Sequence, residues 1–159
     1  MAAPDTPYTK YLAGRDPLVT VPESLDAIRA LTRDWGPDRF ERSYAPGKWS
    51  ARQVLVHLAQ TEVALGNRAR MAVATPRYTA QLFDQDAWIG LDARLSGRDA
   101  TDAFLAVGRM NLAFFQGLSV AQRATAFAHP EYGELTVDWI VHQMAGHHIN
   151  HLLQLQQVP

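Results

Sequence analysis

The sequence predicts an all-α protein, an up-down four-helix bundle built as a single domain over residues 1–159. Three observations predict this fold. Four long amphipathic segments are separated by Pro and Gly, strand patterns are few, and the chain is long enough to bury one core. Hydrophobic residues make up 47% of the chain and charged residues 19%, which is typical of a globular protein.

The first two helical segments carry recognisable start and stop signals. The first covers residues 22–35, where Pro22 suits an opening turn. The second begins after Ser50, which forms a capping-box pattern with Gln53, and it ends before Pro76. We therefore expect two long helices in the first half of the chain.

The second half contains two further helical segments. One covers residues 99–117, and the other opens near Thr136 and runs to the end of the chain. Residues 77–97, between the second and third helices, are expected to be irregular with one short helix. Residues 123–137 fit either a short hairpin around Tyr132-Gly133 or a loop.

The composition excludes several classes of function. There is no cysteine, which excludes disulfides, thiolate metal sites and a cysteine nucleophile. The net charge of −1 argues against binding nucleic acid or acidic lipid through bulk charge. No segment approaches the roughly 20 apolar residues of a membrane span, and the N-terminus lacks a signal-peptide core. We expect a soluble cytoplasmic protein, although the lack of cysteine agrees equally with secretion.

The last helix places histidines on its apolar face. At about 100° per residue, a stripe about 60° wide contains Ile140, Met144, His147, His151, Leu155 and Val158. His148 falls on the shoulder of this stripe and His142 nearly opposite it, so we interpret both as surface residues or as partners of the ligands. His147 and His151 lie one turn apart, a spacing from which both imidazoles can reach one divalent ion.

A third histidine is available from the second helix. His57 shares a face with Val54, Thr61 and Leu65, so it is expected to point inward as well. His129 is interpreted as a loop residue. The alternative is a metal-free bundle in which the three inward histidines are ordinary hydrogen-bonded core residues.

These residues lie in segments that resemble a known family. The stretches "KWSARQVLVHLAQTE", "FDQDAW" and "LTVDWIVHQMAGHHINHLLQL" resemble the DinB/YfiT-like superfamily of metalloenzymes. The resemblance implies an up-down four-helix bundle with one metal held by His57, His147 and His151. Its members include thiol S-transferases that use bacillithiol or mycothiol, and a maleylpyruvate isomerase.

The predicted function is that of a metal-dependent enzyme acting on a small-molecule substrate. Three imidazoles leave an open position on a divalent ion, for which zinc or nickel is preferred over iron or manganese. One hypothesis is a transferase that uses a low-molecular-weight thiol. The alternatives are a metal-dependent hydrolase and a non-catalytic, stress-related metal-binding protein.

The catalytic residues are not identified from the sequence. An H-E-x-x-H protease has a glutamate where this chain has His148, and Glu62 lies about 140° around the helix from His57. Asp84 and Asp86 either approach the metal or serve as loop and cap residues.

Four more side chains have candidate roles. Gln143 and Gln154 share the inward side of the last helix and could orient the imidazoles. Arg68 either meets an anionic substrate or extends to solvent. Ile149 and Leu153 form an outer apolar strip that predicts a homodimer, unless the first helix or the N-terminal segment covers it.

Overall fold

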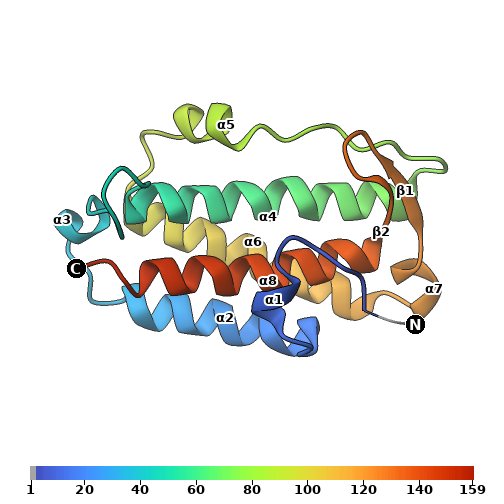
Figure 1. Ribbon diagram of the computed structural model, residues 1–159, viewed down its shortest axis with the longest axis horizontal. Helices are drawn as coiled ribbons and strands as arrows, with labels where there is room; N and C mark the ends of the chain where they lie inside the picture. Colours follow the sequence, from blue (N-terminus) through green and yellow to red (C-terminus); the bar gives the residue numbers. More distant parts are fainter. Residues whose placement is uncertain (1–2) are drawn as a thin grey trace.

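A computed structural model describes residues 3–159 and confirms the four-helix bundle (Figure 1). The long helices are α2 (Pro17–Thr32), α4 (Ala51–Ala74), α6 (Gly97–Gly117) and α8 (Val137–Leu155). The short elements are α1 (Thr9–Leu12), α3 (Pro37–Phe40), α5 (Gln85–Leu91), α7 (Val120–Arg123) and the antiparallel strands β1 (Ala126–His129) and β2 (Gly133–Thr136). Within the described residues, no helix is both long and apolar enough to cross a membrane.

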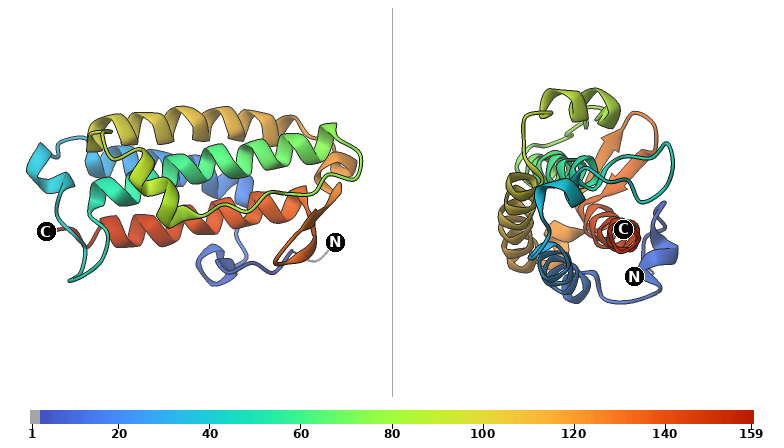
Figure 2. Two further views of the ribbon diagram at one scale, coloured as in Figure 1. Left: turned by 90° about the horizontal axis from the view of Figure 1, so that it is seen from above. Right: turned by 90° about the vertical axis from the view of Figure 1, so that its left-hand side faces the viewer.

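The long helices do not simply alternate in direction. Each of α4 and α2 packs against both α6 and α8. Figures 1 and 2 show that α4 and α6 run in the same direction, whereas α2 and α8 run the opposite way. The reason is the connection formed by residues 75–96, which returns along the outer side of α4 before α6 begins. One long crossover thus replaces a short loop of the expected up-down order.

Most predicted helix boundaries agree with the structure because their capping residues act as expected. Ser50 Oγ accepts a hydrogen bond from Gln53 N at 3.3 Å, and Gln53 Oε1 accepts one from Ser50 N at 2.9 Å. Thr136 Oγ1 accepts from Trp139 N at 3.2 Å at the start of α8. Helix α6 begins two residues earlier than predicted because Ser96 supplies its N-cap.

The first long helix differs from the prediction at both ends. It begins at Pro17 rather than Pro22 because Asp16 Oδ1 accepts a hydrogen bond from Leu18 N at 2.8 Å, with Pro17 at the first position. Pro22 therefore lies inside the helix. Trp35 lies beyond the end of the helix and packs edge-on against Phe40, with ring centroids 5.5 Å apart.

The connecting segments contain the expected short elements. The predicted short helix in residues 77–97 is α5, and the hairpin reading of residues 123–137 is confirmed. Gly133 adopts a φ of +73° at the turn of this hairpin, a conformation that favours glycine. The crossover is joined to the hairpin through a parallel bridge between Thr79 and Ala128. The crossover lies against α4 through α5, and residues 54–62 of α4 are buried on every side of the helix.

The core consists of two apolar clusters along the bundle. On α4 the first cluster ends at Ala59 and the second begins at Leu65. Buried polar residues lie between them on α4. Four buried polar residues, one from each long helix, form a connected layer: Ser24, Glu62, Asn111 and His148.

Hydrogen bonds connect this polar layer across the bundle. His148 Nε2 donates to Glu62 Oε1 at 2.5 Å, and Asn111 Nδ2 donates to Glu62 Oε2 at 2.7 Å. Ser24 Oγ lies 3.0 Å from His148 Nδ1. Each of the four helices is therefore held by at least one polar contact in addition to its apolar packing.

We predict that Glu62→Ala strongly destabilises the protein, because it leaves His148 Nε2 and one Asn111 N–H buried without an acceptor. Removing one partner of such a buried pair costs about 3–5 kcal/mol. Glu23→Ala, at an exposed site on α2, is the matched control and should change stability by less than about 0.5 kcal/mol. Urea unfolding measures both variants, and equal stability of the two would contradict the prediction.

Candidate metal centre

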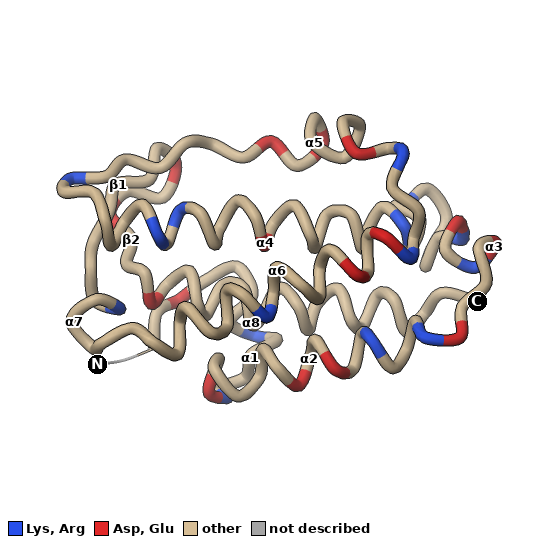
Figure 3. Tube along the Cα trace, turned by 180° about the vertical axis from the view of Figure 1, so that it is seen from behind, with Lys and Arg blue, Asp and Glu red and all other residues tan. Residues whose placement is uncertain are grey.

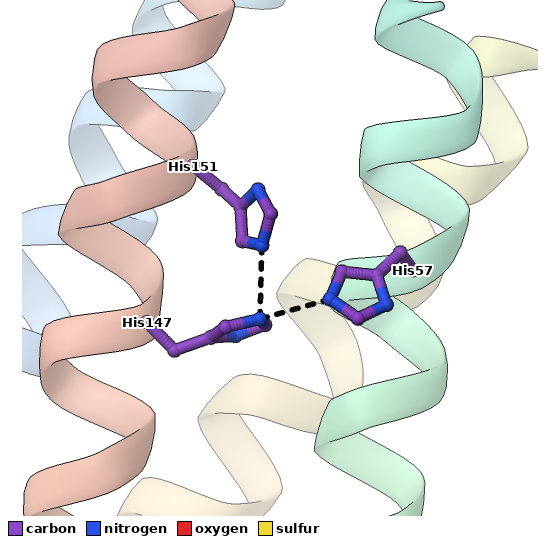
Figure 4. A group of neighbouring side chains, drawn as sticks. All are labelled: His57, His147 and His151. Atoms are coloured by element: carbon purple, nitrogen blue, oxygen red, sulfur yellow. Dashed lines mark hydrogen bonds between the residues drawn. The ribbon is translucent and has the colours of Figure 1, made fainter. Parts of the chain in front are cut away.

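Three histidine side chains meet between α4 and α8 (Figure 4). His147 Nε2 lies 2.9 Å from His57 Nε2 and 2.9 Å from His151 Nε2. All three residues are buried, with exposed fractions of 3%, 6% and 3% for His57, His151 and His147. The structure therefore brings together the three histidines that the sequence singled out.

Hydrogen bonding alone does not satisfy this arrangement. His151 Nδ1 donates to Gln154 Oε1 at 2.6 Å, which leaves a lone pair on Nε2 of the neutral ring. An imidazole nitrogen is either a donor or an acceptor, so His147 Nε2 cannot complete hydrogen bonds with both neighbours. One cation could accept lone pairs from all three nitrogens. Two ligands of a tetrahedral zinc ion lie about 3.3 Å apart, so only a small outward movement is needed.

The three imidazoles are held in their neutral form, which is the form that binds metal. Burial, with a smaller contribution from His151, lowers the pKa of His57 to about 3. Burial lowers the pKa of His151 to about 4, and it lowers the pKa of His147 well below its usual range. Lone pairs are therefore available on these rings at neutral pH.

Aromatic rings and the N-terminal segment fix the positions of two of the imidazoles. The ring centroid of Trp49 lies 5.1 Å from that of His57, and Tyr8 packs edge-on against His147 at 5.1 Å. Gly146 makes the second contact possible, since a Cβ there would lie 2.6 Å from Tyr8 O. His57 Nδ1 and His147 Nδ1 have no hydrogen-bond partner among the described residues, so packing holds these two rings.

A cavity of about 240 Å³ opens beside the histidines. It is lined by His57 and His147 together with Arg68, His129 and other residues of α4, the crossover and the hairpin. A second cavity, of about 340 Å³, shares Arg68, Leu82 and Phe83 with the first. A small molecule can thus approach the imidazoles from this side.

Residues 22–155 match the DinB superfamily. The chain belongs to the DinB superfamily. Two proteins of Oceanobacillus iheyensis are each 24% identical to it. The first match covers 75% of this chain and 69% of the relative, and the second covers 86% of this chain and 84% of the relative. A Bacillus licheniformis protein is 28% identical over 67% of this chain and 62% of its own length. All three are named as proposed metal-dependent hydrolases.

The fold of this DinB superfamily member has a solved counterpart. YfiT from Bacillus subtilis superposes with a TM-score of 0.78 at 17% identity, over 98% of this chain and 90% of that chain. YfiT is described as a probable metal-dependent hydrolase with an unusual four-helix bundle topology. At this level of identity, the likeness shows that the two chains share a fold.

Of the other candidate side chains, only one contacts an imidazole of the cluster. Gln154 contacts His151, as expected, whereas Gln143 lines the cavity without a hydrogen bond to an imidazole. Asp84 is the N-cap of α5, and both it and Asp86 are exposed. These two aspartates therefore act as cap and surface residues.

Two histidines lie elsewhere than the sequence indicated. His148 is not at the surface, because it is 1% exposed and pairs with Glu62 in the polar layer. His129 is not in a loop, because it ends β1, is 6% exposed and lines the cavity. The alternation of buried residues in "AFAH", with Phe127 and His129 on one side, is the signal that could have indicated this position.

We predict that the metal-free protein loses stability as the pH falls from about 6.5 toward 4. The folded-state pKa values of the three histidines lie below the unfolded value near 6.5, so the unfolded chain binds more protons in this range. Thermal unfolding against pH measures the effect. The His57→Ala, His147→Ala, His151→Ala triple variant should show a shallower dependence, and an identical dependence in both proteins would contradict the assignment.

Proposed function

We propose that this chain is a metal-dependent enzyme in which His57, His147 and His151 hold one divalent ion. The observation that carries the proposal is the convergence of three buried Nε2 atoms that no pattern of hydrogen bonds satisfies. The relatives named as proposed metal-dependent hydrolases support it independently. The donor set of three imidazoles suits zinc or nickel, with iron and manganese as alternatives.

The position of the cavity favours a catalytic rather than a structural site. Structural zinc sites are closed by four protein ligands, whereas this cluster contains three histidines and adjoins a cavity. When bound in such a site, a divalent ion supplies a water activated near neutral pH, or it holds a thiolate. A small molecule that enters the cavity reaches the open side of the three imidazoles.

Hydrolysis is the reaction that we propose first, because it agrees with the names of the relatives. The chain offers no carboxylate in the histidine cluster among its described residues, and Glu62 is occupied by His148 and Asn111. Tyr8 also lines the cavity, and burial raises the pKa of its hydroxyl. Tyr8 therefore keeps its proton at neutral pH, and its hydroxyl can donate a hydrogen bond to a bound substrate.

A thiol S-transferase is the second candidate. A long, low-molecular-weight thiol such as bacillithiol or mycothiol needs room beyond the ion, and the two adjoining cavities provide it. Assaying the metal-loaded protein against ester, amide and electrophile panels, with and without added thiol, separates the two reactions. Turnover that requires thiol would favour the transferase. A protein that only loses stability when its metal is removed would instead be a non-catalytic binding protein.

We also propose a homodimer in which a second copy packs against the outer side of α8. Ile149 packs against the core, whereas Leu153 is 44% exposed. The N-terminal segment covers part of this helix through Tyr8 and Gly146. Light scattering on the purified chain measures whether a second copy covers the remainder.

We predict about one divalent ion per chain in protein purified without a tag, and none in the His57→Ala, His147→Ala, His151→Ala variant. His142→Ala is the matched control, because His142 bonds the carbonyl of Asp138 rather than an imidazole. Elemental analysis of the three proteins makes the measurement. Absence of metal from the native chain after zinc and nickel are supplied would contradict the proposed function.

We predict that Gln154→Ala weakens metal binding by about 10–100-fold, the usual effect of losing a partner that orients a ligand. The physical reason is that Gln154 fixes the His151 proton on Nδ1 and so directs Nε2 toward the other two histidines. Gln157→Ala, an exposed change in the same segment, should leave the affinity unchanged. Competition with a metal-binding dye measures both, and equal affinities would exclude an orienting role.

A further inference from the structure

Arg68 is a buried cation without a carboxylate partner. It is 7% exposed, and its Nη2 donates to the carbonyl oxygen of Gln81 at 2.7 Å. Among residues 3–159, no Asp or Glu oxygen lies within 4.0 Å of its guanidinium. A guanidinium carries five N–H donors, and burying its charge is costly unless an anion and hydrogen-bond acceptors compensate. The side chain thus has unused capacity to bind an anion.

His129 adds a second donor to the same cavity. Its Nδ1 accepts hydrogen bonds from the backbone N–H groups of Glu131 at 3.2 Å and Tyr132 at 3.3 Å. The proton of the neutral ring therefore lies on Nε2. Arg68 and His129 line the same cavity. Burial and the charge of Arg68 lower the pKa of His129, whereas Glu131 acts in the opposite direction.

The neighbouring arginine of α4, Arg70, lies in different surroundings from Arg68. Figure 3 shows positive charge on the C-terminal half of α4, near the hairpin. Arg70 donates to Asn111 Oδ1 at 2.7 Å and stacks on Phe114, so it is directed at α6. Arg68 instead lines both cavities. Glu131, the acid that lines the first cavity, is exposed and forms no ion pair with Arg68.

We propose that Arg68, assisted by His129, binds a terminal carboxylate or phosphate of the substrate, whose other end reaches the three histidines. The inference rests on the proposed function, because it assigns the class of substrate for that site. Arg68 follows His57 by eleven residues on α4, a rise of about 16 Å between Cα atoms that the side chains shorten. The substrate is therefore a small acid with several bonds between its anionic group and its reacting atom. Arginine recognises both kinds of anion through paired hydrogen bonds.

The test measures binding of two anions, inorganic phosphate and acetate, to the metal-free full-length chain, so that no ion in the histidine cluster competes for them. Titration is followed by NMR at the Arg68 Nε–H and at the ring nitrogens of His129. We expect saturable shifts at both residues for at least one anion, and the anion that binds more tightly identifies the substrate's group. Arg68→Gln should weaken that binding at least tenfold, whereas Arg68→Lys, which keeps the charge, should weaken it less. Arg94→Gln, an equal change of charge at an exposed site, should stay within twofold of the native chain.

The absence of saturable shifts at Arg68 in the native chain, or equal affinity in native and Arg68→Gln proteins, would overturn the anion site. If Arg68→Gln fails to fold, the native shifts and the Arg68→Lys comparison still decide. Metal content is measured separately on the same preparations. A chain that binds metal but no anion at Arg68 contradicts this inference alone, and a chain that binds the anion but no metal contradicts the proposed function.

Discussion

The contact between α4 and α8 places buried polar side chains at the middle of the bundle, and every one of them needs a partner there. Unpaired polar groups in an apolar interior cost roughly 1–3 kcal/mol each by mutational estimates. Glu62 and His148 meet this requirement on one side of α8, where Asn111 and Ser24 complete the layer. The pairing fixes how α8 is rotated and at which level it meets α4. His147 directly precedes His148 in the sequence, so this pairing also directs His147 at His57.

The two sides of α8 serve different purposes. Both nitrogens of His148 have polar neighbours, and the residue is fully enclosed, so this side holds the helices together. On the other side, His147 Nε2 is close to two nitrogens and its Nδ1 has no partner among residues 3–159. Aromatic packing from Tyr8 and Trp49 positions these rings while a cavity keeps them open to a small molecule. Rigid support from one side and access from the other are what a catalytic metal site requires.

The helical period of the sequence was sufficient for the long helices and for the inward faces of His57, His147 and His151, because each depends on spacing within one helix. That His57 meets the other two across the bundle was implied by the family resemblance. Features that depend on contacts between distant segments were not accessible in this way. The direction of α6 follows from how the crossover lies on α4, and no local pattern encodes that path. The pairing of His148 with Glu62 joins residues 86 positions apart. The shared position of His129 and Arg68 likewise becomes visible only when the hairpin and the crossover enclose one cavity with α4.

The most direct test of the central claim is anomalous diffraction from crystals of the native chain grown with zinc or nickel, recorded at the absorption edge of the metal. The expected result is one strong peak at bonding distance, about 2.0–2.1 Å for zinc, from the Nε2 atoms of His57, His147 and His151. A peak bound elsewhere, or three histidines that contact only one another in the presence of excess metal, would contradict the claim. The three imidazoles would then be core residues of a metal-free bundle.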